Sequence, residues 1–292
     1  MNDSIYSDKP DSFLVHFHQF DEKDIKRCVD GLDAGFERDK WRGEALASHL
    51  LEWLPEFALS ETELKEFKSN TWLPKVQKAV ARIYTTEKAL GQRGEIGELL
   101  LHIAIRQIYS SEPVVCKVFY KTSANDTIKG WDGAHFVKNS NSEYELWLGE
   151  AKFYTNPKDA FRSAYASLKQ HLEASFLKPE REIILTLSNS GGFSIPERIS
   201  HLLHRNTSLD EVMQNICIPI FISYESDALK KYDVSNYIEE IKSEVKSLYD
   251  DFMSSIKGEY NELHLRIILF PMHSKEVLVQ AFDEKIKGLQ KL

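Results

Sequence analysis

The chain has 292 residues, of which 42% are hydrophobic, so it can bury one large domain or a core with an extra lobe. It has no run of about 18 apolar residues, which argues against a membrane-spanning helix. Its three cysteines lie far apart and form no Cys-x-x-Cys pair, which disfavours a disulfide framework and a Cys-rich zinc site. Because the first residues lack the layout of a signal peptide, we expect a cytoplasmic protein with no membrane partner.

The formal net charge of −8 argues at first against a nucleic-acid partner. Residues 1–72, however, hold 16 acidic and 9 basic side chains, which leaves a net of only −1 for the other 220 residues. Residues 151–181 hold six Lys and Arg against three acids. We therefore expect a locally basic strip that can hold a phosphate backbone, and its candidate DNA-binding residues are Lys158, Arg162 and Lys169. The acidic front is a solvated surface or a partner-binding segment.

The residue pattern at the front of the chain predicts a mostly helical segment. Phe13–Phe20 has the composition of a strand. A helical pattern follows over Glu44–Trp53, and we expect Pro55 to end it. Ser60 with Glu63 three residues later is typical of a capping box at the start of another helix.

The spacing of hydrophobic residues changes after residue 90. From there it predicts, in chain order, a helix, three strands, a helix and a strand. These elements cover Arg93–Ser110, Val114–Tyr120, Trp131–Val137, Tyr144–Phe153, Pro157–Phe176 and Glu182–Leu187. The breaks between the three strands are rich in Asn, Ser and Gly, which favours an antiparallel meander.

The last third of the chain continues to alternate helices with strands. It predicts helical pieces near 196–215, a strand at Ile216–Ser223, a long helix near Val234–Ile256, a strand at Leu263–Phe270 and a closing helix. This alternation indicates an α/β fold with a mixed sheet flanked by helices. We expect two units, an N-terminal acidic segment over 1–90 and a main domain with a C-terminal α/β extension over 91–292.

The tripeptide pattern Glu-x-Lys by itself is weak evidence for a catalytic site. It occurs at Glu63–Lys65, Glu66–Lys68, Glu150–Lys152, Glu240–Lys242 and Glu244–Lys246. Four copies lie in charged helical patterns, and only the copy at Glu150 lies in a strand pattern. A period of two places Leu148, Glu150 and Lys152 on one face of that strand. An acid and a base at the end of an apolar face need partners that offset their desolvation.

Asp132 is the expected partner, because it begins the preceding strand and approaches Glu150 if the two strands form a hairpin. Two neighbouring carboxylates repel unless a cation lies between them, and their hard oxygen atoms suit Mg²⁺ or Mn²⁺. Such an ion polarises a scissile phosphate and lowers the pKa of a bound water. Lys152 would orient that water or neutralise charge that develops on phosphorus. We therefore predict a catalytic set of Asp132, Glu150 and Lys152.

A third carboxylate is available on the helix that precedes the strands. Two glycines in its first turns would let this helix pack closely on the sheet, and we choose Glu98 as an outer ligand of the metal or its water. Glu95 is the weaker candidate, since a first-turn acid also complements the helix dipole. Gln170 and His135 are further candidates for supporting the site, each with the alternative of a surface or core position.

These residues carry a family resemblance. Asp…Glu-x-Lys across adjacent strands, after a Gly-x-x-Gly-Glu helix, resembles the PD-(D/E)xK nuclease superfamily, with Trp131 in place of the usual proline. The segments 93–98 (RGEIGE), 131–135 (WDGAH) and 148–153 (LGEAKF) are further similar to the HamA family of nuclease subunits in bacterial Hachiman anti-phage systems. The likeness is specific over roughly 91–190 and loose elsewhere.

The resemblance implies a restriction-endonuclease-like core with an N-terminal α-rich extension. It also implies a Mg²⁺-dependent DNA endonuclease with Asp132, Glu150 and Glu98 as metal ligands, acting in defence beside a partner helicase. A nuclease with no visible base-reading motif would endanger its host, so we hypothesise that the partner restrains it through residues 1–90.

Other enzyme classes are disfavoured, since the chain has no P-loop, no Gly-x-Ser-x-Gly elbow and no His-Glu-x-x-His motif. Two alternatives stay open. One is an RNase, or an end-acting nuclease, with the same site. The other is a catalytically silent nuclease-fold module that only binds a partner.

Overall fold

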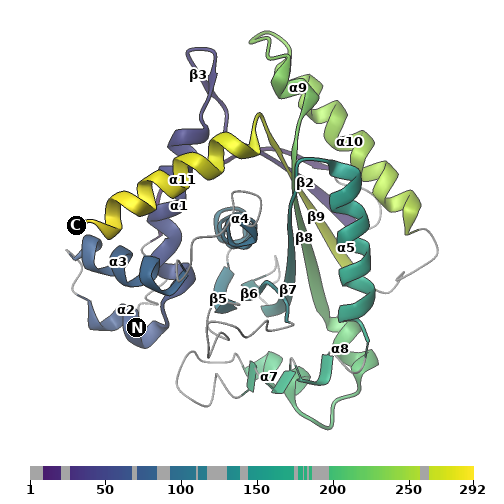
Figure 1. The fold of residues 1–292 in the computed structure, drawn as a ribbon. Helices are drawn as coiled ribbons and strands as arrows, with labels where there is room; N and C mark the ends of the chain where they lie inside the picture. The colour runs from purple at the N-terminus through teal and green to yellow at the C-terminus, as the bar shows by residue number, and fades with distance from the viewer. Residues whose placement is uncertain are drawn as a thin grey trace.

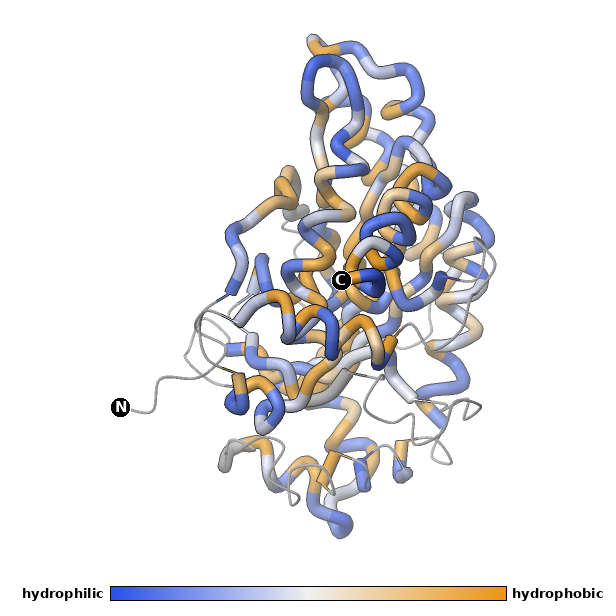
Figure 2. The backbone as a smooth tube through the Cα atoms, turned by 60° about the vertical axis from the view of Figure 1, so that its left-hand side comes forward, coloured by the Kyte–Doolittle hydropathy of each residue, from blue (hydrophilic) through white to orange (hydrophobic). Residues whose placement is uncertain are grey.

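The computed structural model describes most of the chain. Its described residues are 9–20, 27–67, 71–83, 93–109, 111–116, 130–138, 144–173, 177–179, 181–182, 184–185, 197–256 and 263–292. Figure 1 shows a twisted sheet with helices on both sides. In Figure 2, hydrophobic and hydrophilic residues alternate along the helices, as expected where one side of each helix faces a core. No described helix has the length and hydropathy to cross a membrane.

The centre of the fold is a mixed sheet of seven described strands in the order β1-β2-β9-β8-β7-β6-β5. The strands are β1 (Val15–Phe20), β2 (Arg27–Asp33), β5 (Ser111–Cys116), β6 (Gly133–Lys138), β7 (Tyr144–Phe153), β8 (Ile216–Glu225) and β9 (His264–Met272). β5, β6 and β7 form an antiparallel meander. β7, β8, β9 and β2 are parallel, and β1 is antiparallel to β2. β3 (Phe36–Glu37) and β4 (Lys40–Trp41) form a separate hairpin.

Helices cover both faces of the sheet and bury one apolar cluster on each (Figure 1). One face is covered by α1 (Gly43–Ala58), α3 (Trp72–Ile83), α4 (Gly94–Ile108) and α11 (Lys275–Gln290). The other face is covered by α5 (Pro157–His171), α7 (Glu197–Leu203), α8 (Leu209–Asn215) and α10 (Tyr237–Ser255). The structure also includes the short helices α2 (Glu61–Glu66) and α9 (Asp227–Lys230). The α/β fold with a helix-flanked mixed sheet is therefore confirmed.

Most predicted elements agree with the structure to within a few residues, but the strand predicted at Glu182–Leu187 is wrong. Its described residues Glu182, Ile184 and Leu185 are helical, and its other residues lie outside the described part. Ile184 is buried and Leu185 is half-buried, as in a short helix with one inward side. Periodicity cannot separate a short buried strand from a short buried helix. The position beside β7 belongs instead to β8, the strand predicted at Ile216–Ser223, which follows α5 only after α7 and α8.

Other differences lie near the N-terminus. The helix α1 does not end at Pro55 but continues to Ala58, and the Leu59 N–H donates to the Pro55 carbonyl oxygen at 2.9 Å. Pro55 lies in the last turn of α1, where it removes one hydrogen bond to the Leu51 carbonyl but does not end the helix. The capping box of Ser60 and Glu63 is confirmed at the start of α2.

The front of the chain also contributes strands to the main sheet. β1 and β2 extend the sheet beyond β9, and no pattern in the sequence indicated β2. α1 packs against α11 and α4, and its apolar residues belong to the same cluster as theirs. The division into 1–90 and 91–292 stays a prediction, but a deletion of residues 1–90 would remove two strands of the sheet.

Close packing of α4 on β7 depends on glycine. A Cβ atom at Gly97 would lie 2.8 Å from the Cβ atom of Phe153, and one at Gly149 would lie 2.9 Å from Leu101 Cδ2. Contacts below 3.0 Å require the neighbours to shift. Gly94 differs, because a Cβ atom there would meet nothing within 4 Å. One of the two helix glycines therefore permits the close approach that the sequence predicted.

This difference gives a matched pair of variants. We expect Gly97→Ala to lower the free energy of unfolding by about 1 kcal/mol, because overpacking against β7 exceeds the gain in helix propensity. Gly94→Ala should leave it unchanged or raise it slightly. Urea denaturation followed by circular dichroism measures both. Equal stability of the two variants would show that α4 does not need glycine to pack here.

Candidate functional site

The pairing of β6 with β7 places Asp132 beside the end of β7. The register pairs Gly133 with Gly149, and the Asp132 N–H donates to the Gly149 carbonyl oxygen at 2.9 Å. The Asp132 carboxylate then accepts a hydrogen bond from the Ala151 N–H at 2.8 Å. Asp132 is 5% exposed, so its side chain is fixed within the sheet edge. The predicted approach of Asp132 to Glu150 is thus a property of the strand register.

Glu150 and Lys152 lie on the face of β7 that α5 covers. Glu150 is 5% exposed, and the Lys152 ammonium donates to its Oε1 atom. Burial raises the pKa of Glu150, and the nearby Asp132 carboxylate raises it further, while Lys152 acts in the opposite direction. Two buried acids and one lysine therefore share one end of the sheet, and the acids repel one another.

Two further contacts come from α5, and sequence analysis missed both. The Lys152 ammonium donates to the Ser167 hydroxyl at 2.9 Å, and His171 Nδ1 lies 3.4 Å from Glu150 Oε2. The His171 ring also lies 4.6 Å from that of the buried Trp131. The helical spacing in the sequence could have indicated both residues. Ser167 and His171 are four residues apart, on the same side of the helix as the buried Ala164.

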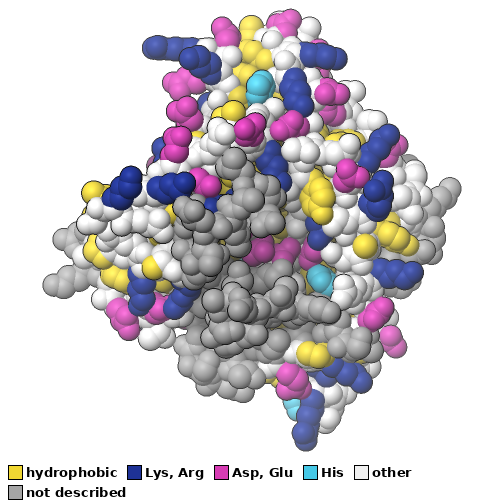
Figure 3. Space-filling view, in the orientation of Figure 1, with side chains coloured by type: hydrophobic (Ala, Val, Ile, Leu, Met, Phe, Trp, Pro, Cys, Tyr) yellow, Lys and Arg dark blue, Asp and Glu magenta, His cyan; other side chains and the backbone are white. Residues whose placement is uncertain are grey.

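A pocket of about 540 Å³ opens at this end of the sheet. Its lining includes Asp132, Glu150 and Lys152, together with Glu98 from α4. The carboxylate chosen from the preceding helix therefore lies at the same pocket as the strand residues. Figure 3 shows acidic side chains gathered near the middle of the molecular face drawn in Figure 1.

Lys275, in the first turn of α11, also lines this pocket and was not predicted. Its ammonium donates to the Phe153 carbonyl oxygen at 2.7 Å and lies 4.4 Å from the centre of the Phe153 ring. Burial lowers the pKa of Lys275, which the Glu225 carboxylate partly counters. It follows β9, more than a hundred residues after Lys152, so local spacing gave no signal.

Glu95 has a different environment from Glu98. It is 9% exposed and forms an ion pair with Arg93 at 3.2 Å. Arg93 also pairs with Asp283 of α11 at 3.2 Å. This buried triad joins α4 to α11, and Glu95 is not among the residues that line the site pocket.

The remaining candidates lie away from the pocket lining. Gln170 is exposed on α5, one residue before His171. His135 faces the α4 side of the sheet, where its ring lies 5.2 Å from that of His102. Burial, with a smaller effect of His102, keeps the pKa of His135 well below its usual value, so its ring is neutral. Neither candidate touches the catalytic set in the described structure.

The three proposed DNA-binding residues share one exposed side of α5. At 100° per residue, Lys158, Arg162 and Lys169 fall within about 40° of one another, and Ser167 lies on the opposite side. Arg162 pairs with Asp159 at 3.1 Å and is 78% exposed. The basic strip therefore faces away from the site pocket.

The donor set of the pocket suits a hard divalent cation. Among the described residues, no three His, Cys, Asp or Glu side chains are grouped as a ready metal site. Mg²⁺ does not need such a group, because it keeps several waters and binds one or two carboxylates plus substrate phosphate. Asp132 and Glu150 meet that requirement, and a cation between them would relieve the repulsion that raises the pKa of Glu150.

The fold and the site define a mixed α/β protein with a carboxylate and lysine centre at the end of its antiparallel meander. The sequence model of the HamA family matches residues 11–286, which include every strand of the sheet. The chain belongs to the HamA family. It is similar to "Anti-bacteriophage protein A" of Escherichia coli (strain K12), with 22% identity over 266 residues. The match covers 90% of this chain and 48% of that relative, so the chain spans about half the relative's length.

The Arg93 triad provides a test of what holds α4 against α11. We expect Arg93→Ala to lower the free energy of unfolding by about 3 kcal/mol, because it leaves two buried carboxylates without their cation. Arg162→Ala removes an exposed ion pair and should change it by less than about 0.5 kcal/mol. Urea denaturation measures both, and similar midpoints for the two variants would contradict a structural role for the triad.

Proposed function

We propose that this protein is a metal-dependent nuclease with a restriction-endonuclease-like core, and that it cleaves phosphodiester bonds in DNA. The observation that carries the proposal is the convergence of Asp132, Glu150, Lys152 and Glu98 on one pocket. The core assignment is supported by the order of α4, the antiparallel meander, α5 and, after α7 and α8, the strand β8 that pairs parallel to β7. The copies of Glu-x-Lys at Glu63, Glu240 and Glu244 lie on the helices α2 and α10 and not beside an aspartate of a neighbouring strand, which distinguishes the copy at Glu150.

Asp132 and Glu150 would hold Mg²⁺ or Mn²⁺, with Glu98 as an outer ligand through water. The bound ion would supply Lewis acidity toward the scissile phosphate and a more acidic water. The Ala151 N–H fixes one oxygen of Asp132, so the carboxylate is oriented before any ion binds. Preorganisation of this kind lowers the cost of assembling the site during reaction.

Lys152 is held by two acceptors at the edge of the pocket, Glu150 and Ser167. From this position its ammonium can donate to a phosphate oxygen and offset the negative charge that develops during attack. His171 approaches the other oxygen of Glu150 and limits the orientations of that carboxylate. The α5 helix therefore positions the acid and the base of the site without entering the pocket lining.

Membership of the HamA family and the printed name of the Escherichia coli relative support a role in anti-phage defence. We infer that the chain acts there as the nuclease subunit, restrained by a partner helicase. An RNase or end-acting nuclease would use the same site, and a silent partner-binding module is the non-enzymatic alternative. The complete acid and lysine set favours an active enzyme, because a silent module has no need to bury repelling carboxylates.

Cleavage assays test the proposal. We expect Asp132→Asn and Lys152→Ala to reduce Mg²⁺-dependent cleavage of supercoiled plasmid by at least about 100-fold, through loss of cation binding and of charge stabilisation. Lys246→Ala is the matched control, since it alters another Glu-x-Lys copy whose exposed lysine pairs with Asp250. Linear duplex, single-stranded DNA and RNA substrates separate the alternatives. If both site variants cleave as fast as the parent, the site assignment is wrong.

The pH dependence of cation binding gives a second test. Glu150 binds a cation as the carboxylate, and its raised pKa means that it takes up a proton at a higher pH than an ordinary glutamate at 4.5. We therefore expect Mn²⁺ affinity to fall as the pH is lowered from about 8 to about 5, with the loss beginning above the usual glutamate range. Isothermal titration calorimetry measures it. Affinity that stays constant until the pH reaches ordinary glutamate values would contradict this environment for Glu150.

A further inference from the structure

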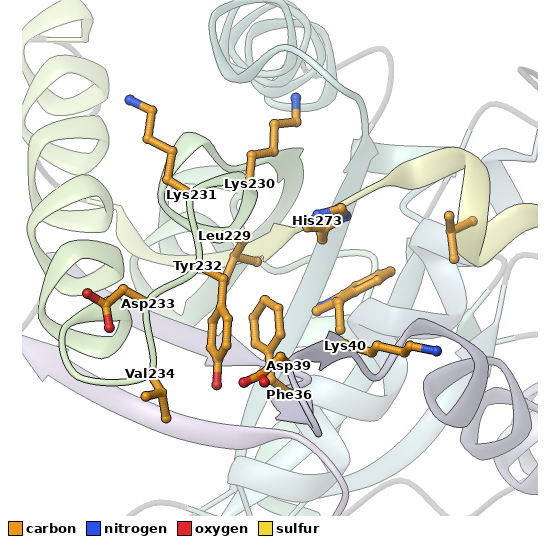
Figure 4. A pocket seen from close by; sticks show the side chains of 12 residues that line it. Phe36, Asp39, Lys40, Leu229, Lys230, Lys231, Tyr232, Asp233, Val234 and His273 are labelled. Carbon is orange, nitrogen blue, oxygen red and sulfur yellow. The ribbon is translucent and has the colours of Figure 1, made fainter.

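We propose that a second pocket, lined by aromatic rings and lysines, binds an unpaired nucleotide of a nucleic-acid strand whose neighbouring phosphodiester lies in the site pocket. This inference rests on the proposed nuclease function. The pocket has a volume of about 970 Å³ and is here called the aromatic pocket. Three separate segments line it: the β3–β4 hairpin, the turn after α9, and the joint between β9 and α11 (Figure 4).

Aromatic rings form the centre of the aromatic pocket. Phe36 and Tyr232 stack with ring centres 3.7 Å apart and an interplanar angle of 14°. Figure 4 shows the two rings side by side. Trp41 faces His273 with ring centres 6.4 Å apart and an angle of 27°. All four side chains are half-buried, so each ring is held by neighbours and keeps some exposed surface. Nucleobases stack on such surfaces whatever their sequence, since every base has a π face.

Three lysines line the same pocket as these rings. They are Lys40, Lys230 and Lys231, and Figure 4 shows their side chains extending away from the stacked pair. Lys230 pairs with Glu225 at 2.9 Å. The pocket also contains two acids, Asp39 and Asp233, and the Asp233 carboxylate accepts hydrogen bonds from the backbone and hydroxyl of Ser235 within its own turn. A ring centre with lysines around it suits both parts of a nucleotide, the base and the phosphate.

The first turn of α11 separates the aromatic pocket from the site pocket. Lys275 lines the site pocket, while His273 and Val277 line the aromatic pocket. Residues two apart lie within about 7 Å along the chain, so the two pockets are close neighbours. A strand with a phosphate near Lys275 can therefore pass over this turn and place an adjoining base against Tyr232. In this arrangement Lys275 would contact the connecting backbone.

The occupant must have an unpaired base. Bases inside a duplex already stack on their neighbours and do not present a free face to a side chain. The aromatic pocket therefore predicts preference for single strands, gaps or flaps over blunt duplex.

Binding measurements in EDTA test the inference without any cleavage. We expect Tyr232→Leu to weaken the affinity for a fluorescein-labelled oligo-dT strand by about 5- to 30-fold, the effect of losing one stacked base. Tyr232→Phe should restore affinity to within about 2-fold, because the ring is kept. Binding of a blunt duplex should not distinguish the two variants. Fluorescence anisotropy measures each affinity, and circular dichroism verifies folding.

A charge variant supplies a test that does not disturb the ring packing. We expect Lys231→Ala to weaken oligo-dT binding and to reduce its dependence on salt concentration, while Lys287→Ala at the far end of α11 changes neither. Oligo-dT binding by Tyr232→Leu as tight as by the parent, or an equal loss for blunt duplex, would overturn the inference. The inference would also be overturned if Tyr232→Leu kept its DNA affinity but lost a co-purifying protein. That result would identify the aromatic pocket as a protein-docking surface. These readouts do not involve cleavage, so they are separate from the Asp132→Asn result that decides the proposed function.

Discussion

The hydrogen bond from the Ala151 N–H to the Asp132 carboxylate fixes the geometry on which the site depends. It joins the start of β6 to the end of β7, where the regular pairing of the two strands has just ended. Without this donor, a carboxylate that is 5% exposed would have to offset its desolvation elsewhere. Because the same strand pair carries Glu150 and Lys152, the spacing between the acids is set by backbone register and not by flexible side chains.

This geometry has a cost in stability, which the proposed cation binding would relieve. Burial and Asp132 raise the pKa of Glu150, so the ionised pair opposes folding at neutral pH when no cation is present. Lys152 and Ser167 offset part of that cost through their contacts at the same end of the sheet. A site of this kind binds a cation more strongly than an isolated carboxylate does, because the ion also relieves the repulsion.

Features that depend on neighbouring residues could be predicted from the sequence, and those that depend on distant segments could not. The strand position of Glu150 and the approach of Asp132 follow from alternation and a short hairpin. Glu98 and the close packing at Gly97 follow from one helix pattern. The strand predicted at Glu182–Leu187 failed because a short apolar run suits either a helix or a strand. β2 pairs with β9 across more than two hundred residues, so no local pattern gave its place. Lys275 was missed for the same reason.

The positions of the cations change how the charge of this chain is interpreted. The basic strip predicted after residue 150 lies on the outer side of α5, away from the pocket, and its role in DNA binding stays a prediction. The lysines near the acids come instead from β7 and from the start of α11. The lysines of the aromatic pocket lie beyond that same turn. If the two proposals hold, a nucleic-acid strand would follow these few cations over the joint between β9 and α11, although the protein is acidic overall.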